Sequence, residues 1–376
     1  MSEALAPGRV VATLGRMKLT RLTTDHLSVP LGKPSRVSLT DPLPNAPDRV
    51  DLLLVQLETD SDVAGLGFTY LIGPGAATVH ALIQTELSAL VVGEDPRETD
   101  RLLAKVEEFF RPVGFAGLAA RAYAAIDVAL WDITAKAAGV PLAQLLGGWR
   151  PEAPFFVSDL TGDVVKNGRS LVKQGATGVR IEIGSGDVQA EADRVRAISE
   201  SLGDEVWVSV AAEGRFNLVT AQALAHFFED IGIDCFEDPI PAADDIGYAR
   251  LAATTETPLA VGSGFNSREA FFRVIRAGHV RTVRPDVCRL GGLTPLLKVA
   301  TVAEAYHVAV SPVRMPEVGV HLACGLASIA HVDSVGWFRD VFQGGPRITP
   351  GKLVPPAEPG LGLRVNHEVV AKWRVS

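Results

Sequence analysis

The chain has 376 residues, 47% of them hydrophobic and 21% charged, and a formal net charge of −8. This length is too great for one ordinary core and predicts two domains, or one α/β barrel with additions. The apolar runs are far shorter than the roughly 20 residues of a membrane helix, so no membrane span is expected. Short basic runs give no electrostatic basis for binding nucleic acid. Three widely separated cysteines, without a CxxC pair or a histidine cluster, argue against disulfides and structural zinc and predict a reducing cytoplasm.

The first part of the chain predicts a tail, then strands, then helices. Residues 1–16 have no continuous apolar stretch, so we expect a disordered tail and not a secretion signal, with Met17 as a second candidate start. Residues 17–71 predict strands, with a turn formed by 60–62 and 65–67. Apolar spacing of three and four residues predicts helices at 78–92, 100–110 and 115–139. The last of these is apolar around most of its circumference and is expected to lie buried between domains.

From residue 155 onward, short β-rich runs that end in polar residues alternate with amphipathic helices. The helical patterns cover 187–202, 218–231, 267–278, 293–307 and 318–330. The steps from Ala211 to Glu237, Ser263, Asp286 and Val313 are 26, 26, 23 and 27 residues. Each step has the length of one strand, one helix and two loops, which predicts a parallel barrel with right-handed crossovers. The Pro- and Gly-rich composition after residue 344 predicts an irregular segment that returns to the first domain.

Several stretches carry a resemblance to a known family. They are residues 124–132 continuing through 139–141 and 146–148, Phe-Glu-Asp-Pro at 236–239, 285–294, and Pro-Gly-Leu-Gly at 359–362. In these residues the chain resembles the enolase superfamily, in its mandelate racemase, muconate lactonizing enzyme-like and acid-sugar dehydratase branch. The resemblance implies an α+β capping domain at 17–139, a modified TIM barrel, (β/α)7β, at 140–339, and a C-terminal segment at 340–376 that packs back on the cap. It also implies a homo-oligomer.

The resemblance implies a chemistry in which a Lys or His base removes a proton beside a carboxylate while Mg²⁺ stabilises the enediolate. Three carboxylates, at the ends of strands three, four and five, would hold the ion. Glu237 matches the middle ligand, whereas Ala211 and Ser263 occupy the other two positions. Two of the three ligands are therefore replaced, and bound Mg²⁺ is doubtful. A nucleotide cofactor is not expected, because no GxGxxG follows a strand of the barrel.

The family's two candidate bases are also replaced. Its Lys-x-Lys at the end of strand two aligns with Arg180-Ile-Glu182. Asp286 matches the acid of the His-Asp dyad, but its histidine partner is replaced by Val313. His307 and His321 are the histidines nearest in sequence that could replace this base. Arg180, Glu182 and Asp286 therefore become the candidate catalytic residues.

The residues leave three interpretations of the polar groups expected at the strand ends. In the first, arginines neutralise acids in an ion-pair network of Arg180, Arg284, Arg314, Glu182, Glu213, Glu237 and Asp286. In the second, Glu213 takes the metal-ligand role lost at Ala211, and Glu182 or Asp286 assists Glu237. In the third, the site works without metal. Arg180, Arg215 or Arg314 clamps a carboxylate of the substrate, and Glu182 or Asp286, with a pKa raised by burial, moves the proton. Arg284 is a further candidate for substrate binding.

The predicted function is that of a lyase or racemase acting on a small hydroxy-acid or sugar-acid carboxylate held between the cap and the strand ends. His26, in the segment 23–32, is expected in the cap loop that closes over the substrate. The alternative is a catalytically silent carboxylate-binding or regulatory protein without metal.

Overall fold

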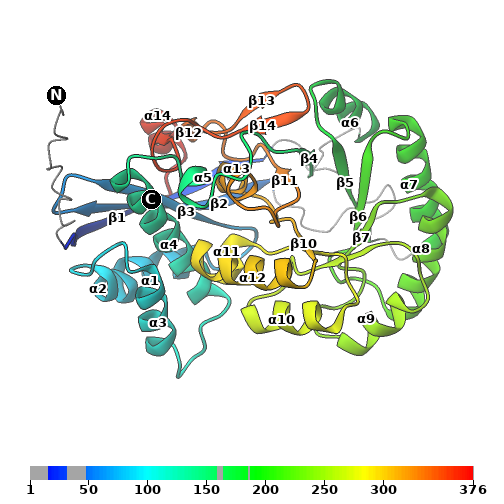
Figure 1. Cartoon of the computed structure of the whole chain (residues 1–376), viewed down its shortest axis with the longest axis horizontal. Helices are drawn as coiled ribbons and strands as arrows, with labels where there is room; N and C mark the ends of the chain where they lie inside the picture. Colours follow the sequence, from blue (N-terminus) through cyan, green and yellow to red (C-terminus); the bar gives the residue numbers. More distant parts are fainter. Residues whose placement is uncertain (1–15, 32–47, 159–163, 185–186, 376) are drawn as a thin grey trace, which may run out of the picture.

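The computed structural model describes residues 16–31, 48–158, 164–184 and 187–375. Nearly all of the predicted tail therefore lies outside the described residues. The first domain and the barrel lie side by side, and the C-terminal segment runs along both (Figure 1). The predicted domain boundaries stay a prediction.

The first domain consists of an antiparallel sheet and a layer of helices (Figure 1). Its strands, in sheet order, are β1 (Leu19–Pro30), β2 (Arg49–Thr59) and β3 (Ala64–Leu71). Its helices are α1 (Ala76–Leu82), the π-helix η1 (Ile83–Leu87), α2 (Ser88–Val91), α3 (Thr99–Phe109), α4 (Leu118–Ala137) and α5 (Leu142–Leu145). Leu53 and Val55 of β2 join the core beneath the helices, whereas Leu52 and Leu54 join the larger core shared with the barrel. Because successive strand residues face opposite sides, both faces of this sheet are buried, which explains the continuous apolar run in β2.

Helix α4 packs directly on β3. Gly65 and Gly67 were predicted to lie in the turn, and this prediction is wrong because both lie inside β3. A Cβ atom at Gly67 would lie 2.0 Å from the carbonyl oxygen of Ala125 in α4. The glycines therefore allow a close approach of helix and strand and do not form a turn. The prediction of a buried helix at 115–139 is confirmed by α4, which has most of its side chains buried.

Two buried acids in α4 join the first domain to the rest of the molecule. Asp127 accepts hydrogen bonds from the backbone N–H of Thr294, at 2.8 Å, and from its hydroxyl, at 2.6 Å. Asp132 accepts from the N–H of Leu66, at 2.8 Å, and from that of Leu361, at 2.7 Å. Helix α4 is thus bonded to its own sheet, to the barrel and to the C-terminal segment.

The second domain is built on eight parallel strands, which confirms the predicted barrel architecture. They are β4 (Phe155–Val157), β5 (Gly178–Glu182), β6 (Trp207–Ala211), β7 (Cys235–Glu237), β8 (Leu259–Val261), β9 (Thr282–Val283), β10 (Ala309–Val310) and β11 (Val332–Ser334). Each strand from β4 to β9 pairs with the next in the chain, and β11 pairs with β4. A parallel bridge between Val310 and Ile329 brings the two ends of this curled sheet together.

Helices cover the outside of the barrel (Figure 1). They are α6 (Val164–Lys173), α7 (Val188–Leu202), α8 (Leu218–Ile231), α9 (Asp245–Ala252), α10 (Arg268–Ala277), α11 (Val287–Leu290), α12 (Leu293–Ala305) and α13 (Pro316–Gly325). Helix α8 matches its predicted range, because Asn217 caps its start by accepting from Thr220 N–H and Gly232, with φ of 75°, ends it. The prediction of a helix reaching residue 330 is wrong. The chain leaves the helix at Leu326, and the following residues bond to Val310 as an extended segment.

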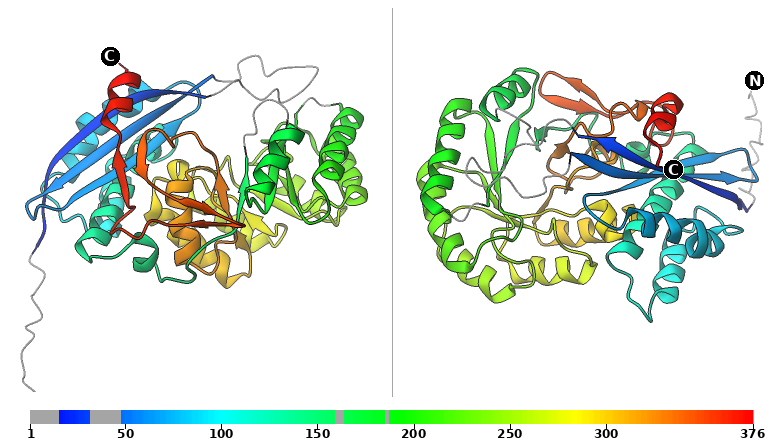
Figure 2. Two further views of the ribbon diagram at one scale, coloured as in Figure 1. Left: turned by 90° about the horizontal axis from the view of Figure 1, so that it is seen from above. Right: turned by 180° about the vertical axis from the view of Figure 1, so that it is seen from behind.

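The C-terminal segment was predicted to be irregular, and this prediction is wrong as well. It forms β12 (Phe342–Gly344), β13 (Arg347–Thr349), β14 (Lys352–Val354), β15 (Leu363–Val365) and α14 (His367–Trp373). After α14, the N–H of Val375 donates to the carbonyl of His26 at 2.8 Å, so the end of the chain lies beside β1 (Figure 2). Gly345 and Gly351, both with positive φ, connect short strands here and do not mark the absence of structure.

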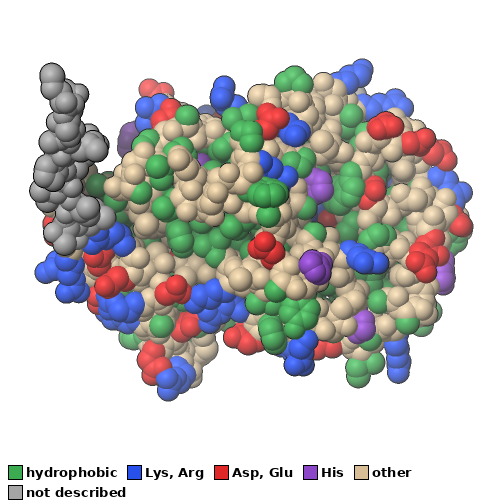
Figure 3. All heavy atoms as spheres, viewed as in Figure 1, with side chains coloured by type: hydrophobic (Ala, Val, Ile, Leu, Met, Phe, Trp, Pro, Cys, Tyr) green, Lys and Arg blue, Asp and Glu red, His purple; other side chains and the backbone are tan. Residues whose placement is uncertain are grey.

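The face of the molecule in Figure 3 carries interspersed basic and acidic side chains. Among the described helices, none is both long and apolar enough to cross a membrane.

Candidate site at the carboxyl ends of the barrel strands

Three neighbouring strands bring their last residues to one level of the barrel. Glu182 of β5 pairs in register with Ala211 of β6, and Ala211 pairs with Glu237 of β7. Because the strands are parallel, their carboxyl ends meet at the same edge, where active sites of such barrels are formed. Ser263, Asp286 and Arg314 follow the ends of β8, β9 and β10 and complete this edge.

Arg180, near the end of β5, lies at the centre of a cluster of carboxylates. Its Nε donates to Glu237 Oε2 at 2.9 Å and its Nη1 to Glu182 Oε1 at 3.0 Å. Its Nη2 donates to Glu213, which follows β6. Only 3% of the Arg180 side chain is exposed, so its charge is compensated by these acids and not by water. The structure thus brings together four of the residues singled out from the sequence.

A second buried arginine, Arg284 of the β9 end, reaches Glu237 from the other side, with Nε 3.4 Å from Oε2. It also donates to Ser311 at 2.9 Å and to Asp333 at 3.1 Å. Ser209 donates to the other oxygen of Glu237. Burial alone would raise the pKa of Glu237, but Arg284 and Arg180 hold that pKa below its ordinary value. Arg284 is 1% exposed, so its charge is compensated by groups inside the barrel.

The three family positions for metal ligands do not offer an octahedral oxygen shell. Ala211 presents a methyl group, and both oxygens of Glu237 are bonded to Ser209 and Arg180. The hydroxyl of Ser263 donates to Asp238 at 2.5 Å. Within the described ranges, no group of three His, Cys, Asp or Glu side chains could hold a metal ion. The guanidinium of Arg180 lies where carboxylates converge, so these residues do not fit Mg²⁺.

Residues that follow the strand ends have unusual backbone conformations. Glu213 has φ of 52°, Asp238 of 41° and Arg314 of 57°, all in the left-handed region that non-glycine residues rarely adopt. Burial raises the pKa of Asp238 to about 6, although its hydrogen bond with Ser263 acts in the opposite direction. Such strain is concentrated at functional sites, and here it marks the edge that holds the candidate residues.

Asp286 is separate from the Arg180 cluster. It caps the start of α11 by accepting from the N–H groups of Cys288, at 2.8 Å, and Arg289, at 3.3 Å. Its other oxygen accepts from the hydroxyl of Tyr70 in the capping domain, at 2.8 Å. The guanidinium of Arg121 lies 3.8 Å from the same oxygen. Burial and the charge of Asp286 raise the pKa of Tyr70 well above its ordinary value, so the phenol remains a proton donor in this bond.

Val313, at the position where the resemblance implies a histidine, is buried. His321 is fully buried, with Nδ1 accepting from Ala143 N–H at 3.2 Å and Nε2 facing the carbonyl of Leu361 at 3.2 Å. His307 follows α12. The placement of His26 in a cap loop is wrong, because it lies in β1 and its ring is 2.9 Å from Asp51 of β2. The antiparallel pairing of β1 with β2 runs from Leu19 to Pro30 and so extends through this segment.

The remaining substrate-binding candidates lie at the barrel mouth. Arg215 is exposed, and its Nη1 donates to the carbonyl of Ile183 at 3.1 Å. The Arg314 guanidinium lies over the ring of Trp337, 5.5 Å from its centroid. Both arginines remain candidates for binding an anion, because neither guanidinium is buried as deeply as Arg180.

Sequence analysis did not single out several residues that the structure places in this site. They are Tyr70, Arg121, Ser158, Ser209, Ser311, Asp333 and Trp337. Asp333 binds Arg284 and also accepts from Ser158, which follows β4. The signal for Asp333 was its place at the end of the eighth strand. It was not recognised because the preceding residues had been assigned to a helix.

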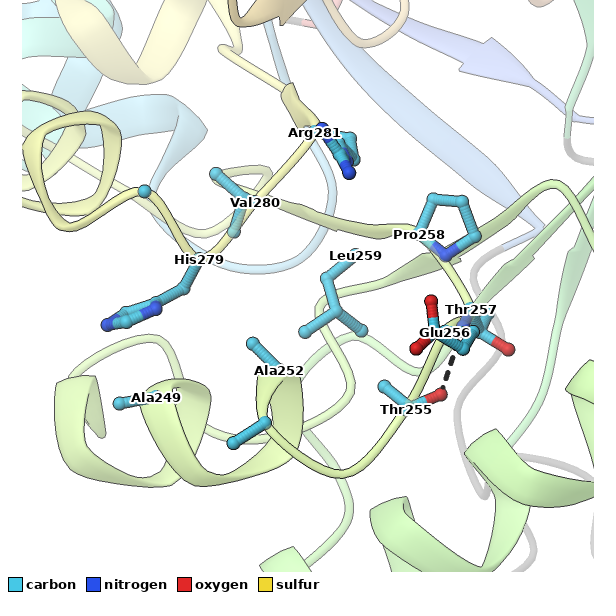
Figure 4. A pocket seen from close by; sticks show the side chains of 12 residues that line it. Ala249, Ala252, Thr255, Glu256, Thr257, Pro258, Leu259, His279, Val280 and Arg281 are labelled. Carbon is cyan, nitrogen blue, oxygen red and sulfur yellow. Dashed lines mark hydrogen bonds between the residues drawn. The ribbon is translucent and has the colours of Figure 1, made fainter.

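A cavity of about 420 Å³ lies elsewhere, between the ends of α9 and α10. Figure 4 shows its lining, which includes Thr255, Pro258, His279 and Arg281. These residues precede β8 and β9, so the cavity is at the amino ends of the strands. It is therefore at the opposite end of the barrel from the candidate site.

A capping domain over eight parallel strands, with polar residues gathered at their carboxyl ends, defines an enolase-like protein. Residues 35–147 match the family described as mandelate racemase / muconate lactonizing enzyme, N-terminal domain. Residues 163–369 match the family described as enolase C-terminal domain-like. The chain belongs to the mandelate racemase and muconate lactonizing enzyme group of the enolase superfamily, which confirms the resemblance noted in its sequence.

Individual relatives act on sugar acids. The chain is 32% identical to D-galactonate dehydratase of Ralstonia nicotianae, covering 94% of each protein. It is 26% identical to 3,6-anhydro-alpha-L-galactonate cycloisomerase of Streptomyces coelicolor, covering 95% of this chain and 99% of the relative. The crystal structure of L-talarate dehydratase from Polaromonas sp. JS666, complexed with Mg and L-glucarate, superposes with a TM-score of 0.86 at 29% identity, covering 96% of this chain and 98% of that one.

Proposed function

We propose that the protein binds a small sugar-acid or hydroxy-acid carboxylate between the cap and the strand ends, and acts on it as a lyase or racemase without a divalent ion. The observation that carries the proposal is the binding of Glu237, the one carboxylate at a family ligand position, by Arg180. The names of the relatives support a sugar acid as the substrate class. The magnesium in a related structure is a property of that protein. The side chains at this site favour a reaction without a divalent ion.

The chain's own residues can bind and orient such a ligand. Arg314 and Arg215 lie at the mouth, where guanidinium groups can bind a carboxylate through paired hydrogen bonds. Glu182 lies at the end of β5 with 21% of its side chain exposed, so one carboxylate edge can face a ligand. We assign it the removal of the proton next to the ligand's carboxylate. Negative charge then develops on the carboxylate oxygens, where the arginines stabilise it. An arginine supplies charge without chelation, so we expect a slower or an easier reaction than that of the Mg-bound relative.

A specific observation also favours the alternative, a protein that binds carboxylates without turnover. Each candidate base is already engaged, because Glu182 is paired with Arg180 and Asp286 accepts from Tyr70 and from backbone N–H groups. A carboxylate with these partners has fewer free lone pairs with which to accept a proton from a ligand.

The test measures binding and proton exchange separately. Calorimetry with galactarate and D-galactonate, in buffer containing EDTA, reports binding without metal. Proton NMR in deuterium oxide then reports exchange of the α-proton of whichever acid binds. Binding with exchange that Glu182→Gln abolishes supports the enzyme, and binding without exchange supports the silent protein. If both acids bind only when Mg²⁺ is restored, the metal-independent proposal is wrong. Glu107→Gln is the matched control, because Glu107 pairs with Arg268 at 2.7 Å, with both side chains about one third exposed and outside the site.

A further inference from the structure

Glu213 lies in a tight turn that directs its side chain over the barrel. Its φ of 52° is unusual for a residue with a long side chain. The turn is held on both sides by backbone bonds, from Ala212 N–H to the carbonyl of Glu237 at 3.0 Å and from Gly214 N–H to that of Asp238 at 2.6 Å. The side chain is 25% exposed, so solvent still reaches it. The backbone conformation is thus maintained by the neighbouring strand end.

The carboxylate of Glu213 is bonded to one arginine and lies within the electrostatic influence of two others. Arg180, from the adjacent β5, donates to it directly. Arg314 follows β10, which stands four positions from β6 in the eight-stranded order, on the opposite side of the barrel. Burial would raise the pKa of Glu213, but the charges of Arg180 and Arg314, with that of Arg215, lower it to about 2. A carboxylate that is bonded to Arg180, and whose pKa is also lowered by the charge of an arginine from the opposite side of the barrel, is directed towards the middle of the barrel mouth.

The middle of the mouth is also where a ligand would have to lie in order to contact both Glu182 and Arg314. A ligand carboxylate has the same charge and the same planar pair of oxygens as Glu213. Two carboxylates at one set of arginines repel each other, so they compete for it. We propose that Glu213 is an internal occupant of the carboxylate subsite, which holds the arginines in the empty protein and is displaced by the carboxylate of a sugar acid. This inference rests on the proposed function and names the residue that limits affinity at that site.

Competition makes a distinctive prediction, because loss of a residue in the binding site should strengthen binding. Glu213→Gln keeps the length of the side chain and removes its charge. We expect it to bind galactarate at least tenfold more tightly than the unaltered protein, in calorimetry at low ionic strength with EDTA present. Glu213→Asn is the second variant, because asparagine tolerates the left-handed backbone if the glutamine variant fails to fold. Glu107→Gln should leave the affinity unchanged.

The arginine side of the subsite is tested in the same assay. Arg314→Asn retains a residue suited to φ of 57° and removes the guanidinium. It should weaken galactarate binding at least tenfold in both the unaltered and the Glu213→Gln background.

The outcomes separate the two proposals. If the unaltered protein binds galactarate and both Glu213 variants bind it equally or more weakly, Glu213 contacts the ligand or is irrelevant to it, and the inference is overturned while the proposed function stands. If neither the unaltered protein nor any variant binds galactarate or D-galactonate, the proposed function itself fails. Tighter binding by the Glu213 variants, lost with Arg314→Asn, supports both.

Discussion

Replacement of Arg180 by methionine tests whether the site depends on its internal cation. Methionine has about the length of the aliphatic part of arginine and no charge, so Arg180→Met removes three ion pairs while retaining the packing of that part. Among the described residues, Glu237, which is 0% exposed, would retain the Arg284 nitrogen at 3.4 Å and the hydroxyl of Ser209 as partners. The substitution therefore leaves a buried carboxylate without most of the positive charge that compensates it.

The expected loss follows from the burial of each pair. Removal of one partner of a buried ion pair costs about 3–5 kcal/mol. The pairs with Glu182 and Glu213 involve partly exposed carboxylates and add at most about 1 kcal/mol each. The pair with Glu237 thus dominates, and the total corresponds to a decrease in melting temperature of roughly 4–9 °C for a chain of this size.

Urea unfolding of the unaltered protein and of Arg180→Met would measure this loss. The double variant with Glu237→Gln should recover most of it, because the buried charge is then absent. Arg101→Met is the control, since Arg101 pairs with Glu94 and Glu98 at 2.5 Å on an exposed surface, and it should leave the unfolding midpoint nearly unchanged. A loss below about 1 kcal/mol for Arg180→Met would refute the view that Arg180 is the central cation of the site.

Other substitutions address pH, metal and the contact between domains. Burial raises the pKa of Glu317 to about 7, so its stabilising contribution is complete below the ordinary value of 4.5 and is lost as pH rises through 7. Glu317→Gln should therefore be more stable than the unaltered protein at pH 8, by about 3 kcal/mol, and nearly equal to it at pH 4.5, whereas parallel urea-unfolding profiles would contradict this. Ala211→Asp with Ser263→Glu should not bind Mg²⁺ in calorimetry while Arg180 is present, but should bind it once Arg180→Met is added; binding by the double variant would show that the guanidinium does not block the ion. Tyr70→Phe removes a buried 2.8 Å hydrogen bond and should lower the free energy of unfolding by about 1–3 kcal/mol, and an unchanged value would mean that this bond adds nothing.

The sequence predicted the fold well where local patterns determine structure. Helices such as α7 and α8 have clear apolar stripes and capping residues, so their ranges agree closely with prediction. The regular steps between strand ends reflect a strand, a helix and two loops, and the structure confirms that repeat. Secondary structure was predicted less well where it depends on pairing between distant segments, as residues 328–330 show. They looked helical, but they bond to Val310 in β10.

The sequence predicted which residues form the site better than it predicted which of them bond to each other. Parallel strand ends indicated that Arg180, Glu182 and Glu237 would be neighbours, and they are. Which acid a long arginine side chain reaches depends on the space left by its neighbours. Arg180 reaches past β6 to β7 where Ala211 presents only a methyl group. The contact between Tyr70 and Asp286 spans 216 residues and two domains, and no local pattern signals it.

The bonding of α4 limits how a ligand can reach the site. Asp127 and Asp132 bind the barrel, the sheet of the first domain and the C-terminal segment at once. Gly67 lets the helix lie against β3 with no room for sliding. A hinge rotation of the whole cap would break these buried hydrogen bonds together and expose their polar groups. The two domains should therefore move as one rigid body, and ligands should be admitted and released by local rearrangement at the mouth, with little change in the radius of gyration of the molecule.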